Sequence, residues 1–193
     1  MLHYTSENAV AKTPPVEICG TPKYWAARLY VGPLAAAISS QWLEWCGITH
    51  ILCVLGRFDD NQCETKEWKA AHAHRQAGIS YLDWPIGNTS ERSLGRAVFS
   101  SLSKVLSRPN NAVLVHCRNG KDRSCMAVFA FLRLQMSFTH GDALQALRVR
   151  VGCNGKPLFN LNDQHQAVLN WYHDSLDESC EEAPFEAVWT KHA

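Results

Sequence analysis

One short segment in the second half of the chain combines a thiol with cationic and hydroxyl side chains. It reads His116-Cys117-Arg118-Asn119-Gly120-Lys121-Asp122-Arg123-Ser124 and directly follows the apolar run 112–115. Where a buried strand ends in a tight loop and a helix begins, backbone N–H groups and the helix N-terminus converge and bind an anion. A cysteine at that point is stabilised as the thiolate, the nucleophilic form. The segment therefore predicts attack by Cys117 on a bound phosphate ester.

The other residues of the segment take complementary roles in this interpretation. Arg123 lies six positions after Cys117, where a guanidinium can hold two phosphate oxygens at once. Ser124 can donate to the sulfur when water releases the phosphate. The loop residues Arg118, Asn119, Gly120 and Lys121 are expected to bind the substrate. The alternative interpretation of Cys117 is a buried, inert thiol.

Apolar periodicity and turn residues indicate which elements position this segment. Strands are expected at 29–31, 49–55, 79–84 and 112–116, and helices at 38–46, 64–77, 93–106, 124–136, 140–151 and 161–175. Alternating strands and helices predict an α/β fold, with a central, mostly parallel sheet flanked by helices on both faces. Ligands of such folds bind beyond the carboxyl ends of strands, where Cys117 falls.

The composition places further bounds on the protein. The length of 193 residues, with 46% apolar and 19% charged residues, is typical of one globular domain. A net charge of +1 gives no general attraction to nucleic acid or to anionic membranes. We expect neither a signal peptide nor a membrane span, because the sequence has no basic-then-apolar leader and no apolar run of about 18 residues. A cytoplasmic location is therefore expected.

Eight cysteines are scattered along the chain without a Cys-x-x-Cys pair. This pattern indicates reduced core thiols rather than a disulfide framework. Cys53 and Cys125 can also be read as partners that trap oxidised Cys117 in a disulfide, although core cysteines are the favoured interpretation. The histidines are dispersed, so neither a metal site nor a cofactor is expected.

The segment resembles the motif His-Cys-x-x-Gly-x-x-Arg-Ser/Thr of the dual-specificity branch of the protein tyrosine phosphatases. The likeness extends over about residues 28–172 and includes Leu29-Tyr30-Val31-Gly32, Gly47-Ile48-Thr49-His50-Ile51-Leu52 and Asp142-Ala143-Leu144. It implies a phosphatase that acts on phosphoproteins or phosphoinositides through a cysteinyl-phosphate intermediate. It also implies that His116 orients the loop. A phosphatase domain at 26–175 would then lie between an N-terminal arm (1–25) and an acidic tail (176–193).

The source of the proton for the leaving group is a separate question. In this family an aspartate in the loop after the third strand donates the proton. When the chain is aligned with the family on Pro85-Ile86, Asn88 takes the place of that aspartate, and its side chain has no labile proton. Gly120-Lys121-Asp122-Arg123 resembles bacterial secreted tyrosine and phosphoinositide phosphatases, in which the loop aspartate is the general acid. We therefore favour Asp122, for which a structural salt bridge is the alternative. Asp83 ranks second, since its place in the strand favours its interpretation as a solvated strand residue, and Glu91 ranks third.

The sequence allows more than one interpretation of the substrate class and of the activity. Arg118 and Lys121 could recognise additional phosphates on the substrate, or could form a basic rim that attracts any phosphoprotein. The loss of the acid at Asn88 also fits a pseudophosphatase that binds phosphorylated partners. A rhodanese-like sulfurtransferase is a weaker alternative, because that class lacks the Gly-Ile-Thr-His-Ile strand. Oligomeric state does not follow from the sequence.

Overall fold

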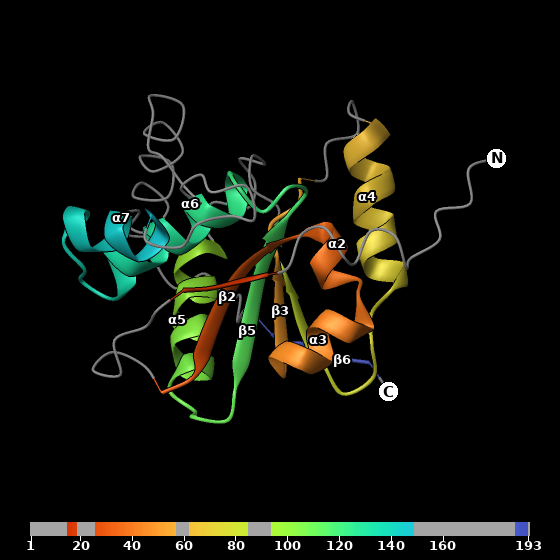
Figure 1. Ribbon diagram of the computed structural model, residues 1–193, viewed down its shortest axis with the longest axis horizontal. Helices are drawn as coiled ribbons and strands as arrows, with labels where there is room; N and C mark the ends of the chain where they lie inside the picture. Colours follow the sequence, from red (N-terminus) through yellow and green to blue (C-terminus); the bar gives the residue numbers. More distant parts are fainter. Residues whose placement is uncertain (1–14, 19–25, 57–61, 85–93, 149–187, 193) are drawn as a thin grey trace.

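The computed structural model describes residues 15–18, 26–56, 62–84, 94–148 and 188–192 (Figure 1). The strands are β1 (Val16–Ile18), β2 (Arg28–Pro33), β3 (His50–Cys53), β4 (Ser80–Asp83), β5 (Ala112–Cys117) and β6 (Thr190–Lys191). The α-helices are α2 (Leu34–Ala37), α3 (Ser40–Cys46), α4 (Gln62–Ala73), α5 (Leu94–Leu106), α6 (Arg123–Ala130) and α7 (His140–Arg148), with a π-helix, η2 (Phe131–Gln135). Asn88, Glu91 and the predicted helix at 161–175 lie outside the described residues.

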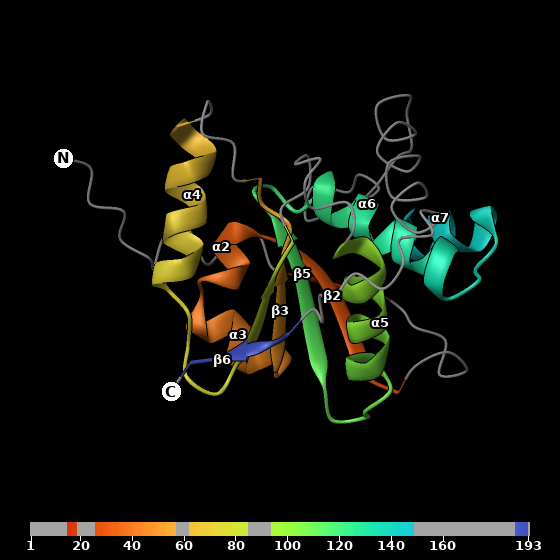
Figure 2. The same ribbon diagram turned by 180° about the vertical axis from the view of Figure 1, so that it is seen from behind.

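The strands form one sheet in the order β1-β2-β5-β3-β4-β6. The four inner strands are parallel to one another, and the two edge strands pair antiparallel. Figures 1 and 2 show α2, α3 and α4 on one face and α5, α6 and α7 on the other. The predicted α/β architecture, with a mostly parallel sheet and helices on both faces, is confirmed.

The middle strand β5 explains why the site has a rigid base. All six of its residues are buried, as expected for a strand that is covered on both faces. Val113, Val115 and Cys117 face the core beneath α5 and α6, whereas Ala112 and Leu114 face the core beneath α2 and α3. Cys117 therefore ends a strand that is fixed by packing on both sides.

Local signals place the helix ends on the α2–α3 side. The helix predicted at 38–46 begins later, as α3 at Ser40, because Ile38 ends the separate short helix α2 and Ser39 adopts extended backbone geometry. The Ser39 hydroxyl accepts a hydrogen bond from the Trp42 N–H (3.3 Å), so it caps the start of α3. Gly47, with φ +62°, ends α3 as predicted.

Three further features differ from the expectations. β1 and β6 come from segments in which we predicted no strand, and each adds one short antiparallel partner to an edge of the sheet. The predicted helix at 124–136 changes at Phe131 from α-helical to π-helical geometry. An apolar pattern indicates which face of a helix is buried. It does not distinguish an α-helix, whose N–H groups bond four residues back, from a π-helix, whose N–H groups bond five residues back.

In the described part of the chain, no helix has the length and apolar character needed to cross a membrane.

Candidate active site

Cys117 lies at the carboxyl end of β5, directly before the loop that leads into α6. Its side chain is only 2% exposed. The Gly120 N–H donates a hydrogen bond to the Cys117 Sγ (3.3 Å), and the Ser124 Oγ lies 3.3 Å from the same sulfur. Ser124 is fully buried in the first turn of α6. The sulfur therefore sits where a loop N–H, a hydroxyl and a helix N-terminus converge, as the sequence predicts.

The loop is held against the β2–α2 junction by backbone contacts. Gly120 has φ +68°, and a Cβ atom at this position would lie 2.5 Å from the carbonyl carbon of Gly32 and 2.6 Å from the nitrogen of Pro33. The Arg118 carbonyl accepts a hydrogen bond from the Leu34 N–H (3.1 Å). Only glycine fits this close approach, so the position of the loop depends on Gly120.

The charged residues of the loop lie toward solvent. Arg118, Asn119, Lys121 and Asp122 are exposed, and Arg123 is half-buried at the first position of α6. The Asp122 carbonyl accepts the Met126 N–H (2.8 Å), but its carboxylate makes no capping hydrogen bond to the helix. The structure therefore brings the predicted residues 117–124 together in one compact turn.

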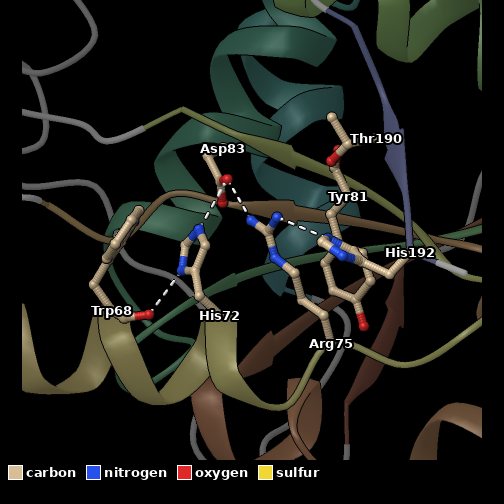
Figure 3. A network of polar contacts seen from close by, with 7 residues as sticks. All are labelled: Trp68, His72, Arg75, Tyr81, Asp83, Thr190 and His192. Carbon is tan, nitrogen blue, oxygen red and sulfur yellow. Dashed lines mark hydrogen bonds and ion pairs between the residues drawn. The ribbon is translucent and has the colours of Figure 1, made fainter.

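Asp83 lies in a different environment. It belongs to the row Asp83–Cys53–His116 that crosses β4, β3 and β5 on the α4 side of the sheet. Its Oδ2 accepts hydrogen bonds from His72 of α4 (2.9 Å) and from Arg75, which follows α4 (2.5 Å) (Figure 3). The Cys117 side chain packs in the core on the opposite face.

The partners of Asp83 keep its carboxylate ionised. Both ring nitrogens of His72 face oxygen atoms, Asp83 on one side and the Trp68 carbonyl (2.7 Å) on the other. Burial acts to raise the pKa of Asp83, but the hydrogen bonds and charges of His72 and Arg75 outweigh it and lower that pKa. Arg75 also donates to His192 (3.0 Å), beside β6 (Figure 3). Asp83 thus serves as a structural anion for α4.

His116 lies directly before Cys117, and its side chain is 1% exposed. Its Nδ1 lies 3.4 Å from the Cys117 carbonyl oxygen and can donate to it. Burial lowers the pKa of His116 to about 4, so the ring is neutral at physiological pH. This contact is the kind of loop-orienting interaction that the sequence predicts.

His116 should make the fold sensitive to acid. Its folded-state pKa of about 4 lies below the ordinary value of 6.5, so the unfolded chain binds the proton more readily. Stability should therefore fall as the pH drops from about 6.5 toward 4, by about 3 kcal/mol in total. Urea unfolding of His116→Gln across this range should show a correspondingly weaker pH dependence than wild type. The exposed His74→Gln is the control, and an unchanged pH dependence in His116→Gln would contradict the prediction.

The cysteines nearest Cys117 are buried thiols. Among the described residues, Cys46, Cys53, Cys117 and Cys125 are buried and form no disulfide bond. Burial raises the pKa of Cys53 to about 12, and burial also raises the pKa of Cys125, whose Sγ lies 3.5 Å from the Gly120 carbonyl oxygen. These environments favour the interpretation of Cys53 and Cys125 as core cysteines.

One contact to the loop was missed in the sequence. Glu67 on α4 forms an ion pair with Arg118, with 2.8 Å between Oε1 and Nε. Fifty-one positions separate the two residues, and no spacing or motif connects them. His72 and Arg75, the partners of Asp83, were missed for the same reason.

The fold of this chain is similar to that of solved structures of dual-specificity phosphatases and a phosphatase-like protein. Human DUSP28 superimposes with a TM-score of 0.57 at 18% identity, over 84% of this chain and 95% of that one. The human tyrosine phosphatase-like serine/threonine/tyrosine-interacting protein matches with a TM-score of 0.57 at 21% identity, over 84% and 97% of the two chains.

A curated relative points in the same direction. Dual specificity protein phosphatase 26 of Rattus norvegicus is 30% identical over 126 residues, which are 62% of this chain. The chain spans about half of that relative, 54% of its length. No model of a known protein family matches the chain.

Proposed function

We propose that this chain is a phosphatase that hydrolyses phosphate monoesters through a cysteinyl-phosphate intermediate. The observation that carries the proposal is the environment of the Cys117 sulfur. It accepts the Gly120 N–H, lies 3.3 Å from the Ser124 hydroxyl and sits at the N-terminus of α6. An anion-binding loop built around a nucleophilic sulfur has the parts that phosphoryl transfer requires.

The reaction proceeds in two displacements. The loop N–H groups and Arg123 bind the phosphate oxygens, and the Cys117 thiolate attacks phosphorus as the bond to the leaving oxygen breaks. The leaving oxygen takes a proton from the general acid. Water then attacks phosphorus and gives a proton to the carboxylate left by the general acid, which restores the acid, while the P–S bond breaks and the sulfur leaves as a thiolate that the Ser124 hydroxyl stabilises. Inorganic phosphate is released.

Asp122 is the proposed general acid. It lies in the phosphate loop itself, exposed at the mouth of the turn, and its carboxylate is not used to cap α6. Asp83 is a poor candidate, because His72 and Arg75 hold its carboxylate on the opposite face of the sheet from the sulfur. A residue that must reach the leaving oxygen has to lie on the sulfur's side.

The acid assignment predicts a leaving-group effect. Asp122→Asn should lower kcat on an alkyl phosphate by about 10²–10⁴-fold, the range of a general acid, and remove one limb of the pH–rate profile. Turnover of p-nitrophenyl phosphate should change little, because its leaving group needs little protonation. Asp83→Asn is the matched control and should keep the wild-type ratio between the two substrates. The assignment fails if Asp83→Asn loses alkyl phosphate turnover and Asp122→Asn keeps it.

A pseudophosphatase that binds phosphorylated partners is the second candidate. It is motivated by Asn88 at the family's acid position, which lies outside the described residues. The buried sulfur with its loop N–H and hydroxyl neighbours favours turnover instead. Binding of phosphate without hydrolysis of either substrate would favour the second candidate. A sulfurtransferase has no support in the similar structures reported above.

A further inference from the structure

The residue that follows the nucleophile is bound by a carboxylate from another element. Arg118 Nε lies 2.8 Å from Oε1 of Glu67, whose side chain is 22% exposed, against 48% for Arg118. Figure 1 shows the first turns of α4 at the same end of the sheet as the carboxyl end of β5. The helix therefore places a negative charge at the rim of the phosphate loop.

The contact has a defined geometry. Within the described residues, Oε2 of Glu67 is buried and has no hydrogen-bond partner. Among the same residues, Arg118 is the one cation that pairs with the Glu67 carboxylate. Breaking the ion pair would leave a partly buried carboxylate without a cation, which is unfavourable. The pair is therefore expected to persist when a small anion occupies the loop.

The ion pair changes the charge that a substrate meets. Arg118, Lys121 and Arg123 make the loop cationic, but Glu67 offsets the charge of Arg118. A second anionic group on the Arg118 side would have to displace Glu67 or lie beside its negative charge. Selectivity that arises from repulsion in this way is common at charged binding sites.

We propose that Glu67 is a specificity-determining residue that selects phosphate esters without a second anionic group beside the scissile phosphate. The proposal rests on the proposed function and narrows its substrate class. Singly phosphorylated alcohols and phenols fit the loop as it stands, whereas substrates with clustered phosphates are disfavoured on the α4 side. The loop's three cations alone would suggest the opposite preference.

Binding of inorganic anions tests this inference without requiring turnover. Calorimetry would give the dissociation constants of orthophosphate and pyrophosphate for wild type, Glu67→Gln and Glu44→Gln at one fixed ionic strength. Glu67→Gln should change the ratio of the two dissociation constants in favour of pyrophosphate by about threefold to fivefold. This change corresponds to the upper part of the energy range for a half-exposed ion pair. Glu44, exposed on α3, loses the same charge away from the loop and should leave the ratio unchanged.

A second comparison separates selectivity from a merely structural role. In an Arg118→Ala background, Glu67→Gln should give a smaller shift in the ratio, because no paired guanidinium is released. An unchanged ratio in Glu67→Gln that folds as wild type and still binds orthophosphate would overturn the inference and leave the proposed function standing. If wild type binds neither anion, the loop is not an anion site and the proposed function falls as well.

Discussion

Replacing Cys117 by serine should abolish turnover of p-nitrophenyl phosphate, with a loss of about 10⁴–10⁶-fold, the range seen when a covalent nucleophile is removed. A serine hydroxyl is a far weaker nucleophile than a thiolate, and within the described residues no histidine or carboxylate is hydrogen-bonded to this sulfur to act as its base. Steady-state kinetics on purified protein measure the loss. The substitution is small, so the fold should persist.

The control for this variant is Cys46→Ser, which changes a buried cysteine on the other face of the sheet. It should keep turnover close to the wild-type rate while it loses some stability. A Cys117→Ser variant that keeps activity within tenfold of wild type would show that Cys117 is not the nucleophile. Retained phosphate binding by Cys117→Ser would show that the loop still folds around its anion.

Gly120→Ala should have the largest effect on stability among single substitutions in the loop. The added Cβ would lie 2.5–2.8 Å from backbone atoms of Gly32 and Pro33, which cannot rotate away, and φ is +68°. Left-handed strain of about 1–2 kcal/mol and overpacking of about 1–3 kcal/mol should together lower the free energy of unfolding by about 2–5 kcal/mol. Turnover should fall too, because the Gly120 N–H donates to the Cys117 sulfur.

Gly78→Ala is the matched control, because Gly78 also has positive φ (+82°) but nothing lies within 4 Å of its added Cβ. It should lose about 1–2 kcal/mol from strain alone and keep full activity. Urea unfolding of both variants gives the comparison. Equal losses for Gly120→Ala and Gly78→Ala would mean that the loop is not held against the β2–α2 junction.

The parts of the fold that the sequence predicts well are those with a local physical cause. The run 112–115 is continuously apolar, so it forms a strand buried on both faces, and Gly47 ends α3 because it adopts positive φ. The thiol, the glycine and the helix start are neighbours in sequence. The arrangement of these groups in one turn could therefore be predicted from local sequence.

The contacts that the sequence did not predict join distant residues. Glu67 meets Arg118, and Asp83 meets His72 and Arg75, only because α4 packs beside the ends of β4 and β5. β1 and β6 are too short for periodicity, and each exists through its pairing with an inner strand. Such interactions are decided by tertiary structure, so local patterns of polarity carry no information on them.

Trapping of the phosphoenzyme tests the central claim most directly. Wild type would be mixed with p-nitrophenyl phosphate, quenched within the first turnovers, digested under conditions that preserve thiophosphate esters, and examined by peptide mass spectrometry. We predict a phosphoryl group on the sulfur of Cys117, and none on that peptide from Cys117→Ser. Rapid release of p-nitrophenol with no phosphoryl group on Cys117 at any quench time would contradict the covalent mechanism.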